Sequence, residues 1–147
     1  MPLFYRMIIN PLTVLNIKRY LSKKYISPDD LVDLDYTFYP LHIEPEVTLL
    51  VYSRYFLNQI EVIRNIALSL PSGMKLVVKE HPAAVGKRPL SYYKKIIAIP
   101  NVEMINSSVE TSTIIKNSKL VSTISGSVGL EGIILGSGTL VTPFADA

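Results

Sequence analysis

The sequence predicts an α/β domain: a Rossmann-like parallel sheet flanked by helices. Two observations support this. Short apolar runs without polar alternation, which are typical of strands buried on both faces, recur along the chain. Segments with apolar residues at helical spacing separate these runs. A repeated strand–helix–strand order places parallel strands in one sheet and helices on its faces.

The first expected elements begin near Ser27. Residues 27–30, Ser-Pro-Asp-Asp, are typical of a helix start, with a capping Ser, an early Pro and acids near the positive end of the dipole. The helix must be short, because the aromatic and β-branched run at 36–39 is typical of a strand and ends at Pro40. A second helix is expected from the spacing of Ile60, Ile63, Ala67 and Leu70, before Pro71-Ser72-Gly73.

The later elements alternate in type. Ser107 and Glu110 have the spacing of a capping box, which predicts a helix from there through Ile115. Gly136 is expected to end the last helix. The expected strands are 76–78, 102–105, 120–124 and 140–142, and the other expected helices are 92–99, after Pro89, and 128–135.

Composition excludes several classes of protein. Of the 147 residues, 48% are apolar and 18% charged, so the chain can bury a core and is not disordered. The net charge of +3 is too small to indicate a nucleic-acid partner. The absence of cysteine excludes disulfides, thiolate nucleophiles and iron–sulfur clusters, and two histidines leave little for a metal site, so none is expected.

Residues 1–26 are expected to form a basic helical or linker segment, and residues 27–147 the Rossmann-like domain, which is expected to be truncated. The basic side chains of the first segment are Arg6, Lys18, Arg19, Lys23 and Lys24, and no acid accompanies them. A solvated helix face is the favoured interpretation; contact with an anionic membrane surface is the alternative. No signal peptide or membrane anchor is recognisable, so we expect a cytoplasmic protein, with a peripheral contact at the inner membrane left open.

The first candidate site comprises Lys79, Glu80, His81 and Pro82, at the carboxyl end of the strand expected at 76–78. Pro82 restricts His81 to an extended conformation, which holds the imidazole in a defined direction. A neutral imidazole can donate to a phosphate oxygen, and an imidazolium adds charge. A surface histidine in a turn is the alternative, but the strand context and Lys79 favour a functional role.

A second candidate site is a glycine- and serine-rich turn directly after the strand expected at 120–124. Glycine allows close backbone approach, hydroxyls donate, and a helix start presents unpaired N–H groups. The turn therefore predicts a phosphate site, although it matches neither the dinucleotide fingerprint nor the Walker loop. A carboxylate one turn into the helix can accept from ribose or sugar hydroxyls. The residues of this site are Ser125, Gly126, Ser127, Gly129 and Glu131.

A third candidate site, at residues 40–46, follows the first strand and contains His42, between Pro40 and Pro45, and Glu46 after Pro45. Because the carboxyl ends of parallel strands meet at one edge of a sheet, three such strand ends predict a shared ligand crevice.

These motifs, in their order along the chain, resemble the bacterial capsule polysaccharide biosynthesis family, which includes the transferases that add Kdo to the lipid end of capsular polysaccharide. The resemblance extends from about residue 36 to residue 144. The matching segments are 40–42 with 45–46, 70–73, 78–82 and 125–131.

The resemblance implies a GT-B glycosyltransferase, of which this chain is similar to the C-terminal, nucleotide-sugar-binding half. Such an enzyme would move Kdo or a related acidic sugar from a CMP-sugar to a glycan or glycolipid acceptor. The nucleotide-sugar is a substrate, and no separate cofactor is implied.

Related bacterial sialyltransferases and polysialyltransferases hold the phosphate and ribose of a CMP-sugar with a His-Pro motif and a Ser-rich motif. The resemblance therefore implies that His81, Ser125 and Ser127 bind the donor phosphate and that Glu131 binds the ribose or orients the donor. It also implies that Lys79 or Glu80 tunes His81. His42 and Glu46 match the first motif and are the candidate catalytic residues near the sugar.

The catalytic base of such an enzyme would usually lie in an N-terminal lobe, for which the 35 residues before the first strand leave no room. We therefore expect a fragment that binds a nucleotide weakly and transfers nothing alone; a reduced natural protein is the alternative. Two other functions stay open. An epimerase-like domain would prefer a UDP-sugar, and a noncatalytic assembly module of a capsule complex would bind no nucleotide and expose an apolar patch.

Overall fold

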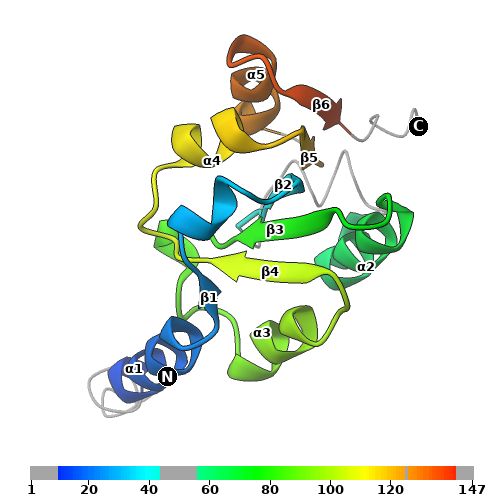
Figure 1. Cartoon of the computed structure of the whole chain (residues 1–147). Coiled ribbons are helices and arrows are strands. Elements are labelled where there is room, and N and C mark those ends of the chain that lie inside the picture. The colour runs from blue at the N-terminus through cyan, green and yellow to red at the C-terminus, as the bar shows by residue number, and fades with distance from the viewer. Residues whose placement is uncertain (1–9, 44–55, 125, 142–147) are drawn as a thin grey trace, which may run out of the picture.

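A computed structural model of the chain describes residues 10–43, 56–124 and 126–141. Its centre is a six-stranded sheet in the order β1-β4-β3-β2-β5-β6, in which every pair is parallel (Figure 1). The sequence predicted a parallel sheet and five of these strands, but neither the strand order nor the two-residue edge strand β1. The strands are β1 (Tyr25–Ile26), β2 (Tyr36–Pro40), β3 (Lys75–Lys79), β4 (Val102–Ile105), β5 (Leu120–Thr123) and β6 (Gly138–Val141).

Helices cover both faces of the sheet. The first three α-helices pack against one face, and the last two lie on the other, at the top of Figure 1. The α-helices are α1 (Asn10–Ser22), α2 (Gln59–Ser69), α3 (Leu90–Ile97), α4 (Thr111–Asn117) and α5 (Ser127–Ile134), and the short 3-10 helices are η2 (Asp29–Leu31) and η5 (Pro82–Ala84).

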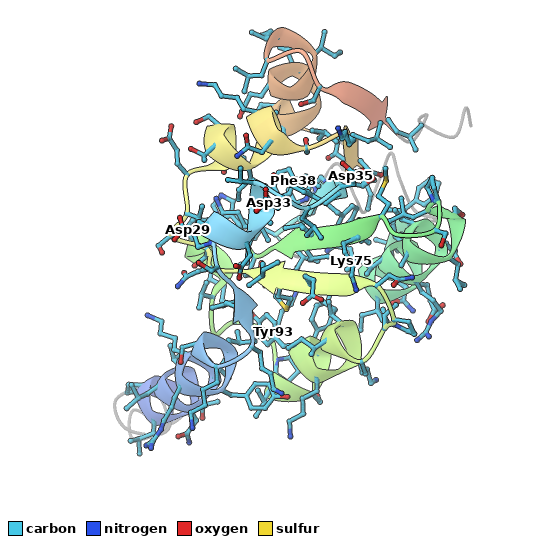
Figure 2. All side chains as sticks on the ribbon, in the orientation of Figure 1. Asp29, Asp33, Asp35, Phe38, Lys75 and Tyr93 are labelled. Atoms are coloured by element: carbon cyan, nitrogen blue, oxygen red, sulfur yellow. The ribbon has the colours of Figure 1, made fainter. Side chains whose placement is uncertain are left out.

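Alternation along the central strands divides the core into two clusters. Leu76 and Val78 of β3 face α1, α2 and α3, whereas Val77 between them faces α4 and α5. Figure 2 shows Tyr93 between α3 and the sheet and Phe38 between the sheet and α4. Both side chains are fully buried. Each such side chain stabilises the fold by roughly 1.5–3 kcal/mol, which explains why both faces of the strands are apolar.

The capping box predicted for the fourth helix is wrong. Helix α4 begins at Thr111, and the residue at its start, Glu110, makes no side-chain cap. The Asn106 side chain instead accepts from the main-chain N–H of Ser108, at 3.0 Å. This local turn competes with helix and delays its start. The Ser-Pro-Asp-Asp signal opens the three-residue η2, which confirms the short helix predicted there.

The N-terminal segment contributes to the fold. Ile17 and Leu21 of α1 are buried in the first core cluster, and β1 pairs with β4. Lys18 and Arg19 of α1, and Lys23 after its end, are exposed. The solvated helix face stays a prediction. The division of the chain at residue 27 stays a prediction. Among the described helices, none is long and apolar enough to cross a membrane.

The strand order reverses between β2 and β5. From β2 the chain continues through β3 to β4 on one side, then returns to β5 and β6 on the other. The arrowheads of β3 and β4 point to the same side of the sheet (Figure 1). In open α/β sheets, ligands bind beyond the carboxyl ends of the strands at such a reversal. The loops after β2 and β5 are therefore the expected position of a ligand in this fold.

Candidate functional site

The three predicted sites lie on loops at one edge of the sheet. The register pairs Pro40 with Lys79, so β2 and β3 end side by side. It also pairs Phe38 with Val121, which aligns β5 with β2. The loops after β2, β3 and β5 therefore begin at the same edge.

His42 joins the loop after β2 to the loop after β5. Its Nε2 lies 3.3 Å from the main-chain N of Ile124 and 3.3 Å from Oγ1 of Thr123. Because the Ile124 N–H donates, Nε2 is the unprotonated nitrogen, and the neutral ring carries its proton on Nδ1. The imidazole is thus oriented across the point where the strand order reverses.

The main chain of His42 is held by buried side chains. Its N–H donates to Oε1 of Gln59 at 2.8 Å, and its carbonyl accepts from Nε2 of Gln59 at 3.1 Å. The same carbonyl accepts from Nη2 of Arg88. Gln59 is the first residue of α2 and is 1% exposed. The start of α2 and the loop before α3 therefore hold the backbone at His42.

Glu80 is the centre of a buried polar cluster. Its Oε1 and Oε2 accept from Nη1 of Arg88 at 2.8 and 2.6 Å, and Oε2 also accepts from the Tyr93 hydroxyl at 3.0 Å. Its Oε1 accepts from the main-chain N–H of His81 at 2.9 Å. Burial and the Glu80 charge raise the pKa of Tyr93, so this hydroxyl stays protonated and donates. Glu80 thus contacts His81 through the backbone rather than through the ring.

Lys79 points to the opposite face, as alternation along β3 requires. Its Nζ donates to the Val109 carbonyl at 2.5 Å and to Oγ1 of Thr111 at 2.7 Å, beside the start of α4. Burial lowers the pKa of Lys79. Both Lys79 and Glu80 therefore hold neighbouring elements together, and their tuning of the His81 ring stays a prediction.

His81 is exposed and has a defined tautomer. It is the N-cap of η5, where its Nδ1 accepts from the main-chain N–H of Ala83 at 3.1 Å. The neutral ring therefore carries its proton on Nε2, which is able to donate. The backbone at His81 is extended, as predicted from the following Pro82.

The loop after β5 turns sharply into α5. Gly126 has a φ of +102°, which L side chains rarely adopt. Ser127 begins α5, and its hydroxyl donates to Oε1 of Glu131 at 3.2 Å, so the carboxylate lies beside the helix start. Gly129 is buried. Within the helix, Gly132 allows close packing, because a Cβ there would lie 2.6 Å from Oγ1 of Thr139.

Two predicted site residues, Glu46 and Ser125, lie outside the described residues. Among the others, His42 contacts the loop after β5 directly. His81 and Ser127 leave the same edge from β3 and β5, with β2 between these strands. Because neighbouring strands are about 4.8 Å apart, the axes of β3 and β5 are separated by about 10 Å.

Sequence reasoning missed Gln59, Arg88 and Tyr93. One signal for Arg88 was available: a carboxylate at the end of a buried strand, here Glu80, needs a cationic partner. The periodicity of α2 and α3 did not distinguish Gln59 or Tyr93 from other residues, because their partners lie on distant loops.

A cavity of about 520 Å³ lies elsewhere in the described part of the chain. Its lining includes Thr37, Ile66, Met74, Leu120 and Leu140. Most of these residues lie near the amino ends of the strands, away from the loops described above, and the lining is mainly apolar. This cavity lies outside the candidate site.

No protein-family model matches the chain. Among known proteins, Protein FixF of Sinorhizobium fredii (strain NBRC 101917 / NGR234) is 30% identical over 122 residues. The match covers 78% of this chain and 28% of FixF. The chain therefore spans less than a third of that relative.

Solved structures with the same fold include a transferase and an epimerase. A KpsC beta Kdo 2,7 transferase from Thermosulfurimonas dismutans matches with a TM-score of 0.59 and 16% identity, over 90% of this chain and 42% of that one. A UDP-GlcNAc 2-epimerase from Methanocaldococcus jannaschii, in complex with UDP-GlcNAc and UDP, matches with a TM-score of 0.51 and 19% identity, over 90% of this chain and 36% of that one. The chain thus shares its Rossmann-like fold with part of a Kdo transferase and part of an epimerase, which confirms the predicted fold class and, at the level of fold, the predicted resemblance.

Proposed function

We propose that this chain is the nucleotide-sugar-binding domain of a larger glycosyl-handling protein. The observation that carries the proposal is the position of His42, His81 and the start of α5 on loops that leave one sheet edge, beside the reversal of strand order. This is the position at which open α/β sheets bind ligands.

The groups at this edge suit a phosphate. The N–H groups at the start of α5 and the proton on Nε2 of His81 are donors, and the helix dipole adds positive potential. The same groups would stabilise negative charge that develops on a departing nucleotide. Glu131, beside Ser127, would accept from ribose hydroxyls.

The finer proposal concerns the donor and the acceptor. The proposed donor is a CMP-linked Kdo or related acidic sugar and the proposed acceptor a glycan or glycolipid; the likeness to a Kdo transferase supports Kdo as the sugar. The catalytic base would come from a second lobe elsewhere in the full protein, which would act in the cytoplasm, with a peripheral contact at the inner membrane. Within this chain, His42 and Glu46 would lie nearest the sugar.

A second candidate function is favoured by the likeness to an epimerase that carries UDP-GlcNAc and UDP. In that case the site would bind a UDP-sugar. The larger protein would then turn over the nucleotide-sugar without an acceptor.

Calorimetry with CMP, CDP, UMP and UDP tests both candidates. We expect a preference for the cytidine nucleotides and a loss of affinity of at least about tenfold in His81→Ala, because a lost hydrogen bond to a charged group is worth about 1.5–3 kcal/mol. Lys75→Ala, at the amino end of β3, is the matched control and should bind like the wild type. A uridine preference would favour the epimerase-like function, and no binding at all would favour a noncatalytic module.

A further inference from the structure

We infer that the buried Glu80–Arg88 ion pair is a positioning element that holds both histidine-bearing loops of the candidate site. The inference rests on the proposed function only in its last step, where both histidines face one ligand. The coupling of the two loops stands on the contacts alone.

On the β3 side, the pair holds His81. Oε1 of Glu80 accepts from the main-chain N–H of His81 at 2.9 Å, and the same oxygen lies 2.8 Å from Nη1 of Arg88. Glu80 is 1% exposed. A carboxylate at this depth requires its cationic partner, so the backbone at His81 depends on Arg88.

On the β2 side, the same guanidinium holds His42. While Nη1 of Arg88 binds Glu80, Nη2 donates to the His42 carbonyl. The two nitrogens of one rigid plane therefore join a carboxylate of the β3 loop to the main chain of the β2 loop. A lysine ammonium lacks this fork and cannot reproduce the geometry.

Helix α3 fixes the ion pair in place. The Tyr93 hydroxyl donates to Oε2 of Glu80 at 3.0 Å, and the Tyr92 ring lies 5.0 Å from the Arg88 guanidinium carbon. Tyr93 is fully buried between α3 and the sheet (Figure 2). The packed helix α3 thus holds the ion pair in position, and the ion pair in turn holds the main chain of the two loops.

The two rings give the inference a direct readout. His42 accepts at Nε2 and His81 accepts at Nδ1, so the two neutral rings carry their protons on opposite nitrogens. Each tautomer depends on where the main chain puts the ring. If Arg88 fixes the main chain at both His42 and His81, its loss should change the tautomers of both rings together.

The experiment is NMR of the full chain with ¹⁵N-labelled histidine rings, recorded without nucleotide, at a pH where both rings are neutral. In the wild type, we expect opposite tautomers for His42 and His81. In folded Arg88→Lys, which keeps the charge, we expect both rings to shift toward the tautomer mixture of an unconstrained histidine side chain. Lys75→Met removes a cation from the half-buried Lys75–Glu103 pair of β3 and β4, and should change neither ring. Two unchanged tautomers in folded Arg88→Lys would overturn the inference.

Tyr93→Phe keeps the inference testable if Arg88→Lys does not fold, because it keeps the ring and removes only the hydroxyl. Tyr93→Phe should speed hydrogen exchange of the His81 amide severalfold and leave exchange of the Ser127 amide unchanged. Equal exchange of the His81 amide in Tyr93→Phe and the wild type would contradict the inference. Because nucleotide is absent, these results are independent of the proposed function. Arg88→Lys should also lower nucleotide affinity about tenfold if the proposed function holds. If the wild type binds no nucleotide, but Arg88→Lys still loses both tautomers, the proposed function alone would be rejected.

Discussion

Nε2 of His42 lies 3.3 Å from the main-chain N of Ile124, so a residue after β2 is hydrogen-bonded to a residue after β5 across the reversal of strand order. Both residues lie beyond the paired positions of β2 and β5, so this contact is separate from the hydrogen bonds of the sheet. The contact makes His42 part of the framework of the candidate site as well as a candidate group within it.

His42→Ala should therefore loosen the loop after β5. A single hydrogen bond contributes about 0.5–1.5 kcal/mol, so the Ile124 amide should exchange with solvent about two- to tenfold faster, as measured by hydrogen exchange and NMR. His81→Ala is the matched control and should leave exchange at Ile124 unchanged, because His81 bonds to its own loop. Equal exchange rates in His42→Ala and the wild type would contradict this role.

Gly126→Ala should reduce both stability and nucleotide affinity. Its φ of +102° is strained for alanine, at a cost of about 1–3 kcal/mol, although a Cβ there would meet open space. Gly73→Ala is the control, since Gly73 has a φ of +88° and equally open surroundings but lies in the turn before β3. It should lower the denaturation midpoint without changing nucleotide affinity. Equal affinity changes in the two variants would argue against a site at the start of α5.

Gly132→Ala should destabilise the chain although alanine favours helix. Its Cβ would lie 2.6 Å from Oγ1 of Thr139 and 3.1 Å from Cγ2 of Val121. Overpacking of this kind costs about 1–3 kcal/mol, against a gain of about 1 kcal/mol in helix propensity. Urea denaturation should therefore show a net loss. Adding Thr139→Ala to Gly132→Ala should recover part of it, and additive losses would contradict the packing explanation.

Tyr36 should contribute to a loss of stability at alkaline pH. Burial raises its pKa to about 12 from an ordinary value of 10.0, and its hydroxyl donates to the Ile114 carbonyl at 2.6 Å. The folded chain therefore keeps a proton that the unfolded chain releases above pH 10.0, so this contribution is complete below pH 10.0 and is lost as the pH rises toward 12.

In Tyr36→Phe the free energy of unfolding should decline less steeply over that range, although the lost hydrogen bond should cost about 1 kcal/mol at neutral pH. The measurement is urea denaturation at several pH values. Tyr20, which is only partly buried, provides the control through Tyr20→Phe, which should leave the slope as in the wild type. Identical slopes in the Tyr36→Phe variant and the wild type would contradict the assignment.

Much of the fold could be predicted from the sequence because its strands are buried on both faces. The apolar run at 76–78 and the aromatic run at 36–39 have no other stable position than the centre of a covered sheet. The two-residue β1 could not be predicted, since its place depends on the edge of β4 rather than on a local pattern. The helix start predicted at Ser107 was wrong because the Asn106 side chain stabilises a competing turn.

The position of the candidate site could be predicted from the sequence, but the hydrogen-bond partners within it were harder to predict. Parallel strands bring their carboxyl ends to one edge, which is why His42 and His81 could be assigned to the same region. The opposite orientations of the Lys79 and Glu80 side chains could also be predicted, since neighbouring residues of a strand face opposite sides. The partner of Glu80 could not be predicted, because Arg88 lies on a loop whose path no local pattern specifies.

An NMR titration of the ¹⁵N-labelled full chain with CMP tests the central claim most directly. If the carboxyl edge of the sheet binds a nucleotide phosphate, the largest shift changes should occur together at the amides of His42, His81, Gly126 and Ser127, and the His81→Ala variant should need at least about ten times more nucleotide to reach them. Changes confined to the cavity lined by Met74, Leu120 and Leu140, or no change at any concentration of CMP or UMP, would contradict it.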